Sequence, residues 1–408
     1  MSKKFIKDRM AKIQFVFCSF APVGLEDYVQ YFKNTFENFI YLKWKFPHSK
    51  GSRSSLTQYK KGEIVLEKSL FSLPTFQQKK LYFLFLPFHY LVYLYQALTL
   101  FRSRRSDLII FMGVNYFCTF CGILLKKVRK VDFVIYRVMD FFPLPPKGIY
   151  RYLNRIFYVI DNYCLSNSDY IWFTTEGHII GRERYGYFDR NKYKDKYLII
   201  PLGINTKKFV FKPVSQRNRY SLVYCGVISR YHMLDLLFEV IRELKNDFPN
   251  IKLNIIGSGP DEMYFKALSK EMDLEKNILF HGFLEEGDFL TSIMVDNILG
   301  IALYRDEENY MKYTEPAKVK YYLMFGLPVV VSKVPPIAME LNEKKVCFAV
   351  NNDKEEVVHL IKRFIQDIDL QEEYLTNICN YVKTVDINKL LETALRKTLR
   401  TLLNRHPR

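Results

Sequence analysis

Short apolar runs alternate with longer amphipathic runs from residue 10 onward, and this alternation restricts the fold more than any other feature. A bounded apolar run of about four to eight residues is typical of a strand buried on both faces, and an amphipathic run is typical of a helix that covers a sheet. The pattern predicts an α/β protein with two Rossmann-like, doubly wound domains. The strands expected in the first half are residues 13–19, 108–113, 133–138, 170–174 and 197–201. Those expected in the second half are residues 221–226, 252–257, 278–282, 298–303, 327–332 and 346–350.

A polar, basic and turn-rich stretch at residues 203–219 separates the two series of runs and is the best candidate for a linker. We therefore expect an N-terminal domain at residues 1–205, a second domain at 206–385 and a C-terminal basic helix at 386–408. The length of 408 residues suits two domains of ordinary size. Residues 43–75 are irregular and rich in Lys, Ser and Gly, so we expect a mobile insertion near a substrate there.

The chain has a formal net charge of +18, which indicates an anionic partner: nucleic acid, an acidic membrane surface or a phosphorylated substrate. Apolar residues make up 49% of the sequence and aromatic residues 16%, which excludes a disordered chain. The clustered basic and aromatic motifs of single-strand binders are not visible, and we expect no nucleic-acid partner.

Seven cysteines, an odd number, lie mostly in apolar runs, which favours reduced thiols in the cytoplasm. Cys118 and Cys121 form a C-x-x-C pair without a second pair of ligands. Asp367 and Asp369 fit a D-x-D pattern, but they follow the helix-like run 355–366 rather than a strand. We expect no metal site.

Residues 81–101 contain no Asp, Glu, Lys or Arg and are flanked by basic residues. The length permits a membrane span, whereas Pro87, His89, Gln96 and the scattered tyrosines oppose one. A helix buried in the protein and a helix with one face in the membrane interface are the two other interpretations. The basic flanks support the interfacial helix, because they attract anionic lipid while aromatic side chains enter the headgroup zone.

Residues 315–331 combine a lysine at the start of a helix with a glycine at its end and a buried strand beyond it. Pro316 fits the first turn of a helix, where the free N–H groups and the helix dipole attract phosphate. Lys318 adds a full positive charge at the same point. Gly326 fits the left-handed position after the last helical residue. The segment therefore predicts an anion site.

The pattern Pro316-x-Lys318-x-x-x-Tyr-Leu-x-x-Gly326-Leu-Pro-Val-Val resembles the donor-site signature of GT-B glycosyltransferases, in the group that includes family 4 and the xanthan-type glucuronosyltransferases. Three further pieces, at residues 199–209, 223–226 and 255–260, resemble other landmarks of that group in the same order. The resemblance covers roughly residues 100–350. It implies two domains that face a cleft, with the donor nucleotide on the second domain and the acceptor on the first.

The resemblance implies that a nucleotide sugar is the donor, a UDP-sugar more than a GDP-sugar, and that no metal or other cofactor is needed. Lys318 would stabilise the departing diphosphate. The other donor-binding residues that it implies are Gly226, Arg230, Gly257, Gly259, His281, Phe283, Glu315 and Tyr321.

The chain departs from the family pattern on the donor side. Tyr313 and Tyr321 stand where family 4 members often have a pair of glutamates, so either Tyr321 or Glu315 is expected to bind the ribose. Val227 and His232 replace an arginine and a lysine that bind phosphate in the same group. Arg230 is the nearest permanent cation and the expected second phosphate partner.

Three residues are candidates on the acceptor side. Asp140 follows a strand, and carboxylates at the carboxyl ends of parallel strands point into a ligand crevice. It could act as a general base on an acceptor hydroxyl, or hold a sugar hydroxyl. Glu176 follows the next strand and is the weaker candidate, and Gly24 lies in the turn after the first strand.

Together these features predict a glycosyltransferase that moves a sugar to a lipid-linked or glycan acceptor in bacterial-type cell-surface polysaccharide assembly. We expect it to be peripheral, at the cytoplasmic face of the cell membrane. Two alternatives are a non-enzymatic basic protein that binds membrane or nucleic acid on the same scaffold, and a sugar-nucleotide epimerase. The donor sugar, the acceptor, the stereochemistry and the oligomeric state stay open.

Overall fold

The computed structural model describes residue 10 and residues 12–21, 25–45, 53–73, 82–101, 108–145 and 147–405. The chain divides into two compact units. Unit 1 consists of Met1–Pro201 together with Asn388–Arg408, and unit 2 consists of Leu202–Ile387. The sequence-based boundaries lie at 205 and 385, whereas the structure divides the chain after Pro201 and Ile387 and assigns the C-terminal segment to unit 1.

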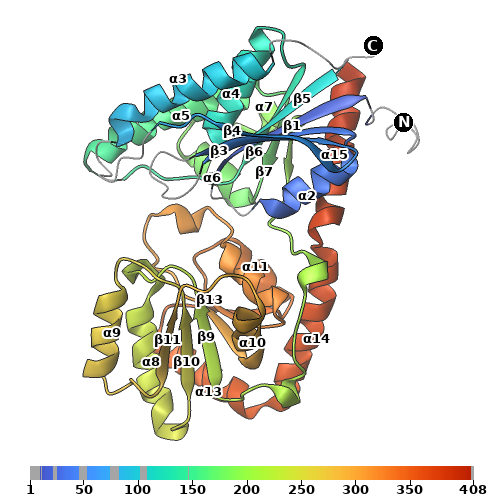
Figure 1. Ribbon diagram of the computed structural model, residues 1–408. Coiled ribbons are helices and arrows are strands. Elements are labelled where there is room, and N and C mark those ends of the chain that lie inside the picture. Colours follow the sequence, from blue (N-terminus) through green and yellow to red (C-terminus); the bar gives the residue numbers. More distant parts are fainter. Residues whose placement is uncertain are drawn as a thin grey trace. The chain divides into compact units, whose positions relative to one another are not determined.

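Unit 1 is built on an eight-stranded sheet with the order β4-β3-β2-β1-β5-β6-β7-β8 (Figure 1). Its strands are β1 Ile13–Ala21, β2 Asn38–Lys45, β3 Ser54–Lys60, β4 Glu63–Leu70, β5 Leu108–Val114, β6 Phe133–Val138, β7 Tyr170–Phe173 and β8 Tyr197–Ile199. Its helices are α2 Glu26–Thr35, α3 Tyr82–Leu100, α4 Asn115–Lys127, α5 Ile149–Asn167, α6 Glu176–Arg184, α7 Arg190–Tyr193 and α15 Ile387–Arg405. The pairs are parallel except β2 with β3 and β3 with β4.

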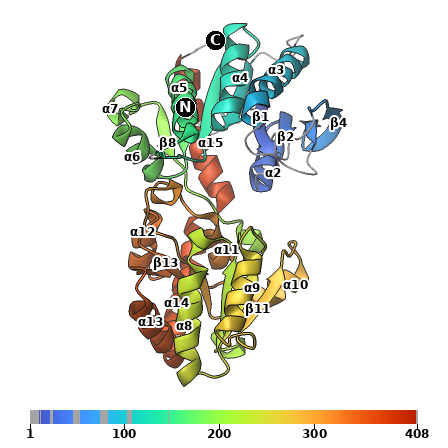
Figure 2. The same cartoon turned by 90° about the vertical axis from the view of Figure 1, so that its left-hand side faces the viewer.

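Helices cover both faces of this sheet, and the alternation of side chains along β1 shows how. Val16 and Cys18 join the core cluster that contains buried residues of α3, α4 and α5. Phe15 and Phe17 point the other way and pack against Phe32 of α2. Figures 1 and 2 show α3, α4 and α5 side by side over one face. On the side of α2, α15 is fixed by a hydrogen bond from Trp172 Nε1.

The segment expected to be an irregular insertion contains part of β2 and the whole β3–β4 hairpin, so the expected lack of regular structure is wrong for the described residues. Its mobility and its nearness to a substrate stay predictions. The hairpin turns at Lys61 and Gly62, whose φ values of 51° and 86° lie in the left-handed region. Strand β4 is exposed almost throughout, because it is the edge of the sheet. Charged residues flank the exposed apolar run Ile64-Val65-Leu66 in β4, so β4 lacks the apolar–polar alternation by which a half-buried strand is predicted.

Unit 2 is an all-parallel, six-stranded sheet with the order β11-β10-β9-β12-β13-β14. The strands are β9 Ser221–Cys225, β10 Lys252–Ile256, β11 Ile278–Gly282, β12 Leu299–Ala302, β13 Val329–Ser332 and β14 Cys347–Val350. The α-helices are α8 Leu234–Asp247, α9 Glu262–Glu271, α10 Asp288–Asp296, α11 Ala317–Met324, α12 Ile337–Glu343, α13 Lys354–Gln366 and α14 Ile368–Thr384. Short 3-10 helices are η1 Thr206–Lys208, η2 Val214–Gln216, η3 Arg230–His232 and η4 Tyr310–Lys312.

Each apolar run expected to be a strand contains one, so the predicted α/β class with doubly wound parallel sheets is confirmed. In both units the carboxyl ends of the parallel strands meet at one edge of the sheet, where ligands bind in open α/β folds. The candidate residues are therefore described unit by unit along these edges.

Helix α3 occupies most of the uncharged stretch at residues 81–101. His89, Tyr93, Gln96 and Ala97 are buried on one side of it, while Phe88, Leu91, Tyr95 and Leu98 are exposed on the other. Within the described part of the chain, none of the helices combines the length and the apolar character that a membrane crossing requires. For the described residues, the interpretations of α3 as a membrane span and as a wholly buried helix are wrong. The helix has one buried face and one exposed apolar face.

Candidate functional site

The anion site expected at residues 315–331 lies at the start of α11, at the carboxyl edge of the unit 2 sheet. Pro316 is the N-cap, with φ −68° and ψ 117°, so the free N–H groups of the first turn follow it directly. Gly326 has φ 66° and ends the helix in the left-handed conformation before β13. The helix start at Pro316 and the helix end at Gly326 are therefore as expected from the sequence.

Lys318 reaches from the first turn of α11 toward β9 and contacts aromatic side chains. Its Nζ lies 3.3 Å from Tyr224 Oη, 4.5 Å from the ring centroid of Tyr224 and 5.3 Å from that of Tyr304. Among the described residues, no carboxylate forms an ion pair with it. Burial lowers the pKa of Lys318 to about 7, and nearby Cys225 opposes that shift. The side chain can therefore gain a proton when an anion arrives.

Two glycines bring the loops after β9 and β10 into contact beside this lysine. A Cβ at Gly226, where φ is 151°, would lie 3.2 Å from Lys318 Nζ. A Cβ at Gly257 would lie 2.0 Å from the carbonyl oxygen of Gly226, far inside van der Waals contact. Gly259 packs as closely, on the backbone of Ile228. The structure thus brings Gly226, Gly257, Gly259 and Lys318 to one edge of unit 2.

Arg230, the expected second phosphate partner, lies in η3 on the same edge. Its guanidinium carbon stacks 4.1 Å from the ring centroid of Tyr264. The backbone N–H of Arg230 donates to Asp261 Oδ2 at 3.0 Å, and its carbonyl accepts from Arg305 Nε at 2.9 Å. The backbone is anchored while the side chain lies on an aromatic surface. Its role toward phosphate stays a prediction.

The remaining donor-side candidates lie in different environments. His281 Nε2 is 2.8 Å from Asn254 Oδ1, while Phe283 is 73% exposed just beyond β11. Tyr321 is half-buried, packs edge-on against Phe325, and has a pKa raised by burial. Phe283 and Tyr321 therefore have surface available to a ligand, and His281 already has a partner.

Glu315 does not fit the expected ribose contact. Its Oε2 accepts a hydrogen bond from the backbone N–H of Leu202 at 2.9 Å. Its Oε1 lies 3.3 Å from Lys320 Nζ, and this ion pair is almost completely buried. Lys320 in turn contacts Tyr381 of α14. The carboxylate therefore stabilises the approach to α11, and the structure does not support Glu315 as a donor ligand.

Tyr322, Tyr304 and His232 lie around Lys318, and the sequence reasoning assigned none of them a role. Tyr322 Oη accepts from the Cys225 N–H at 2.7 Å and donates to the Ile301 carbonyl at 3.0 Å, which holds β9 and β12 at the site. Tyr304 is buried beside Lys318, and His232 lies against its ring. Burial and the charge of Lys318 lower the pKa of His232 to about 3, so it stays neutral. Of these three residues only Tyr322 lies in the motif at residues 315–331, where the pair Tyr321-Tyr322 was its signal.

On the edge of unit 1, Asp140 follows β6 and is exposed as a residue, while neighbouring residues still surround its carboxyl group. The surrounding residues raise its pKa by desolvation, and the charge of Arg182 acts in the opposite direction. Arg182 Nη2 donates to the Asp140 carbonyl at 3.3 Å, and its Nε pairs with buried Asp161 at 2.8 Å. The hydroxyl of Tyr136 donates a hydrogen bond to Asp161 Oδ1 at 2.6 Å. Asp140 is thus a carboxylate on a rigid support.

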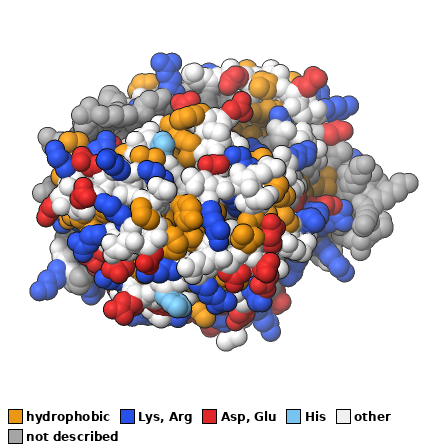
Figure 3. Space-filling view, turned by 90° about the horizontal axis from the view of Figure 1, so that it is seen from below, with side chains coloured by type: hydrophobic (Ala, Val, Ile, Leu, Met, Phe, Trp, Pro, Cys, Tyr) orange, Lys and Arg blue, Asp and Glu red, His pale blue; other side chains and the backbone are white. Residues whose placement is uncertain are grey.

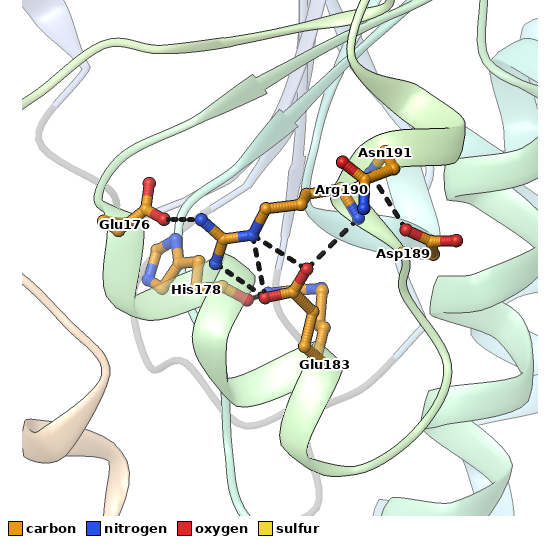
Figure 4. Close-up of polar contacts among 7 residues, drawn as sticks. Glu176, His178, Glu183, Asp189, Arg190 and Asn191 are labelled. Atoms are coloured by element: carbon orange, nitrogen blue, oxygen red, sulfur yellow. Dashed lines mark hydrogen bonds and ion pairs between the residues drawn. The ribbon is translucent and has the colours of Figure 1, made fainter.

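Glu176, the weaker acceptor-side candidate, begins α6 and is held by an ion network (Figure 4). Arg190 lies between two carboxylates, with Nη1 2.6 Å from Glu176 Oε1 and Nη2 2.6 Å from Glu183 Oε2. The pKa of Glu183 is lowered, first by its hydrogen bonds from Arg190. Gly24 lies outside the described residues. Among the residues that the structure describes, no three metal-ligating side chains converge.

The fold of this chain is similar to that of several proteins of known structure. Three solved structures share the fold over nearly their whole length, at TM-scores of 0.70, 0.64 and 0.60. They are sucrose-phosphate synthase from Thermosynechococcus elongatus (13% identity, 96% of this chain and 99% of that one), Anabaena HepE in complex with UDP-glucose (14%, 95% and 99%) and the lipopolysaccharide outer core galactosyltransferase WaaB (13%, 95% and 99%). The fold is that of the GT-B glycosyltransferases.

The family comparison concerns unit 2. Residues 205–378 match the model of the family described as glycosyl transferases group 1. Residues 205–378 thus form a group 1 glycosyltransferase domain on a GT-B fold, and the resemblance to GT-B glycosyltransferases noted in the sequence is confirmed. The comparison with curated proteins found no match.

Proposed function

We propose that this enzyme transfers a sugar from a nucleotide-sugar donor, a UDP-sugar in preference to a GDP-sugar, to a lipid-linked acceptor in cell-surface glycan assembly. The observation that carries the donor part is Lys318 at the start of α11, beside Gly226 and without a carboxylate partner among the described residues. The solved structure of HepE contains UDP-glucose, which supports UDP as the carrier.

The donor diphosphate would lie against the first turn of α11. Free N–H groups, the helix dipole and Lys318 all favour negative charge at this point. When the bond between the sugar and the diphosphate breaks, negative charge grows on the leaving oxygen, and Lys318 stabilises it there. A protein cation in this place supplies the charge that a metal supplies in other transferases, so the proposed reaction needs no metal or other cofactor.

Asp140 would handle the acceptor. Its raised pKa suits a carboxylate that takes the proton of an acceptor hydroxyl as the oxygen forms the new glycosidic bond. The same carboxylate could instead hold a sugar hydroxyl in a retaining reaction. Both roles place it on unit 1, and neither gives it a part in nucleotide binding.

The apolar surface of unit 1 supports a lipid-linked acceptor and peripheral attachment to the cytoplasmic face of the membrane. On α3, Phe88 is 59%, Leu91 60% and Tyr95 68% exposed. On α5, Ile156 is 55% and Val159 70% exposed. Both helices lie with α4 on one face of the sheet (Figure 2). Exposed apolar patches of this kind mark contact with membranes or proteins, and the net charge of +18 favours anionic lipid.

Charge gives a nucleic-acid partner less support. On the face drawn in Figure 3, Lys and Arg side chains are interspersed with Asp and Glu and with hydrophobic side chains. A nucleic-acid-binding face usually carries a continuous basic stripe. The described residues on the face in Figure 3 form no such stripe, and we assign the excess positive charge to phosphorylated substrates and lipid.

Nucleotide binding tests the donor part of the proposal. A ligand that binds only the folded protein raises its melting temperature in proportion to the logarithm of concentration. We expect UDP to raise it more than GDP does, and we expect Lys318→Ala to weaken both effects. Equal melting temperatures with and without any nucleoside diphosphate would refute the proposal.

A further inference from the structure

Arg137, the penultimate residue of β6, is completely buried in unit 1 without a counter-ion among the described residues. Its Nη1 donates to the Trp172 carbonyl at 3.5 Å and its Nη2 to the Ile200 carbonyl at 3.0 Å, while Nε has no partner. A guanidinium offers five N–H donors, so these two bonds leave three free. Arginine is almost never fully buried unless its charge is paired, because an unpaired buried charge is strongly unfavourable.

His178, in the first turn of α6, lies close to this guanidinium and is also completely buried. Neither of its ring nitrogens has a hydrogen-bond partner, and no bond drawn in Figure 4 ends on the imidazole. Burial, followed by the charges of Arg182 and Arg137, lowers its pKa well below the ordinary value. Since Arg182 is paired with Asp161, Arg137 is the cation whose charge is not balanced.

Tyr28 of α2 completes the cluster. Its ring centroid lies 5.6 Å from the guanidinium carbon of Arg137, and its buried hydroxyl has no partner. Tyr28 and His178 each lie near Arg137, so α2, β6 and α6 contribute four unsatisfied polar atoms around it: Tyr28 Oη, Arg137 Nε, and His178 Nδ1 and Nε2. Nearly all buried polar atoms in proteins have a partner, so a concentration of exceptions indicates a missing ligand.

We propose that Arg137, His178 and Tyr28 form a binding site for a small oxyanion, a phosphate or carboxylate group. The planar fork of arginine matches such groups with two parallel bonds, and the start of α6 adds positive potential. Buried water would satisfy Tyr28 and His178 but leave the charge of Arg137 unbalanced. Arg137 precedes Asp140 by three residues at the carboxyl end of β6. We therefore assign the anionic group to the acceptor. Only this assignment to the acceptor rests on the proposed function; the oxyanion site itself does not.

Inorganic phosphate is the probe, and the full chain with Lys318→Ala is the background, because phosphate can also act at the donor site. Melting temperatures are measured in sodium phosphate and in sodium chloride of equal ionic strength. Phosphate should raise the melting temperature by about 3 °C for each tenfold increase above its Kd. Adding Arg137→Met should abolish the rise. Adding Arg190→Met, which removes an exposed arginine of unit 1 with its own carboxylate partners, should leave the rise intact.

A second measurement covers the case in which Arg137→Met does not fold. In the Lys318→Ala protein, the imidazole nitrogen signals of His178, identified by their absence in His178→Gln, should shift on titration with phosphate. A site that holds only water predicts no specific rise in melting temperature and no shift, and either null result overturns the inference. An equal rise in Arg137→Met also overturns it. Because neither readout needs glycosyl transfer, an inactive enzyme that binds phosphate here would refute the proposed function alone.

Discussion

The ammonium group of Lys318 is surrounded by aromatic rings and glycine backbone, without a described carboxylate to hold it. Such a charge is available to a ligand, whereas the second lysine of α11, Lys320, is buried and forms an ion pair with Glu315. The two lysines lie two positions apart and differ in what surrounds them. The two lysines differ in function because Glu315 pairs with Lys320, whereas no described carboxylate pairs with Lys318.

Lys318→Ala tests this role. We expect kcat/KM to fall, with a loss of about 2 to 4 kcal/mol of transition-state stabilisation, because one electrostatic contact to the leaving group is lost. The matched control is Lys270→Ala, which removes an exposed lysine of α9. Steady-state kinetics of both variants make the comparison. Near-normal turnover by folded Lys318→Ala would remove the lysine from the mechanism.

Donor binding should depend on pH through Lys318. The diphosphate favours the charged amine and raises its pKa from about 7, so binding takes up a proton above that pH. Donor affinity should fall as pH rises above about 7. Folding has the opposite trend, because the amine is harder to protonate in the folded chain than in the unfolded one. The free energy of unfolding therefore increases as pH rises from about 7 toward the ordinary lysine pKa of 10.5.

Calorimetry in two buffers of different ionisation enthalpy, such as HEPES and Tris at pH 8, measures the proton uptake directly. Wild type should take up a proton when UDP binds, and Lys318→Ala should take up less. Identical enthalpies in both buffers would show that the lysine is already charged in the free enzyme.

Asp140→Asn is expected to abolish sugar transfer and to leave UDP affinity nearly unchanged, because the residue belongs to unit 1. Rate assays and calorimetry on the same sample separate the two effects. Asp195→Asn, at an exposed loop position of unit 1, is the control for the loss of one negative charge. Loss of UDP binding in a folded Asp140→Asn protein would show that its assignment to the acceptor is wrong.

Some of the candidate site could be predicted from the sequence and some could not. Lys318, Gly226 and Gly257 carry local signals, since a helix start and a strand end are properties of neighbouring residues. The contacts of Glu315 are different: its partner Leu202 is 113 residues away. Tyr322 likewise acts on Cys225 and Ile301, which only the fold brings close. Partners distant in the chain carry no local pattern.

At the scale of elements, α3 is the clearest case in which the sequence left the environment of a helix open. It allowed a membrane span, a buried helix or a helix at the membrane interface. An uncharged helix gives no sign of which side faces the core. The structure decides it through polar contacts on the inner side: Tyr93 donates to the Lys45 carbonyl, and Gln96 donates to the Phe71 carbonyl at 2.7 Å. These bonds fix the rotation of the helix and leave Leu91 and Tyr95 exposed.

A pair of variants on α3 tests the membrane proposal. Leu91→Ser with Tyr95→Ser should reduce sedimentation with anionic vesicles and leave the melting temperature almost unchanged, because both side chains are exposed. Tyr93→Ser is the matched control on the inner side and should destabilise the fold by about 3 kcal/mol. Vesicle binding that survives the double substitution would rule out this face as the contact.

The parallel strands were predictable and the β3–β4 hairpin was not, for a physical reason. A strand buried on both faces must be apolar along its length, so β1, β6 and β13 stand out in the sequence. Edge strand β4 is exposed on both faces, and its sequence mixes the apolar residues Ile64, Val65 and Leu66 with charged ones without a regular alternation. The Lys61-Gly62 turn was the one local signal of the hairpin.

At the scale of the whole molecule, net charge and apolar surface make separable contributions to membrane attachment. Attraction of a chain of charge +18 to anionic lipid is screened by salt, whereas the insertion of aromatic and aliphatic side chains is not. We expect vesicle binding to fall, but not to vanish, between about 0.1 and 1 M salt. Complete release by salt would leave α3 without a role in attachment.

The most direct test of the whole account is donor turnover across a panel of UDP- and GDP-sugars, measured with wild type, Lys318→Ala and Asp140→Asn. Nucleoside diphosphate release without added acceptor reports donor hydrolysis, and product formation with lipid-linked acceptors reports transfer. We predict that one UDP-sugar is cleaved by wild type, that Lys318→Ala slows hydrolysis and transfer alike, and that Asp140→Asn binds the donor but does not transfer the sugar. Absence of cleavage of every nucleotide sugar, or transfer that is equal in all three proteins, would contradict the account.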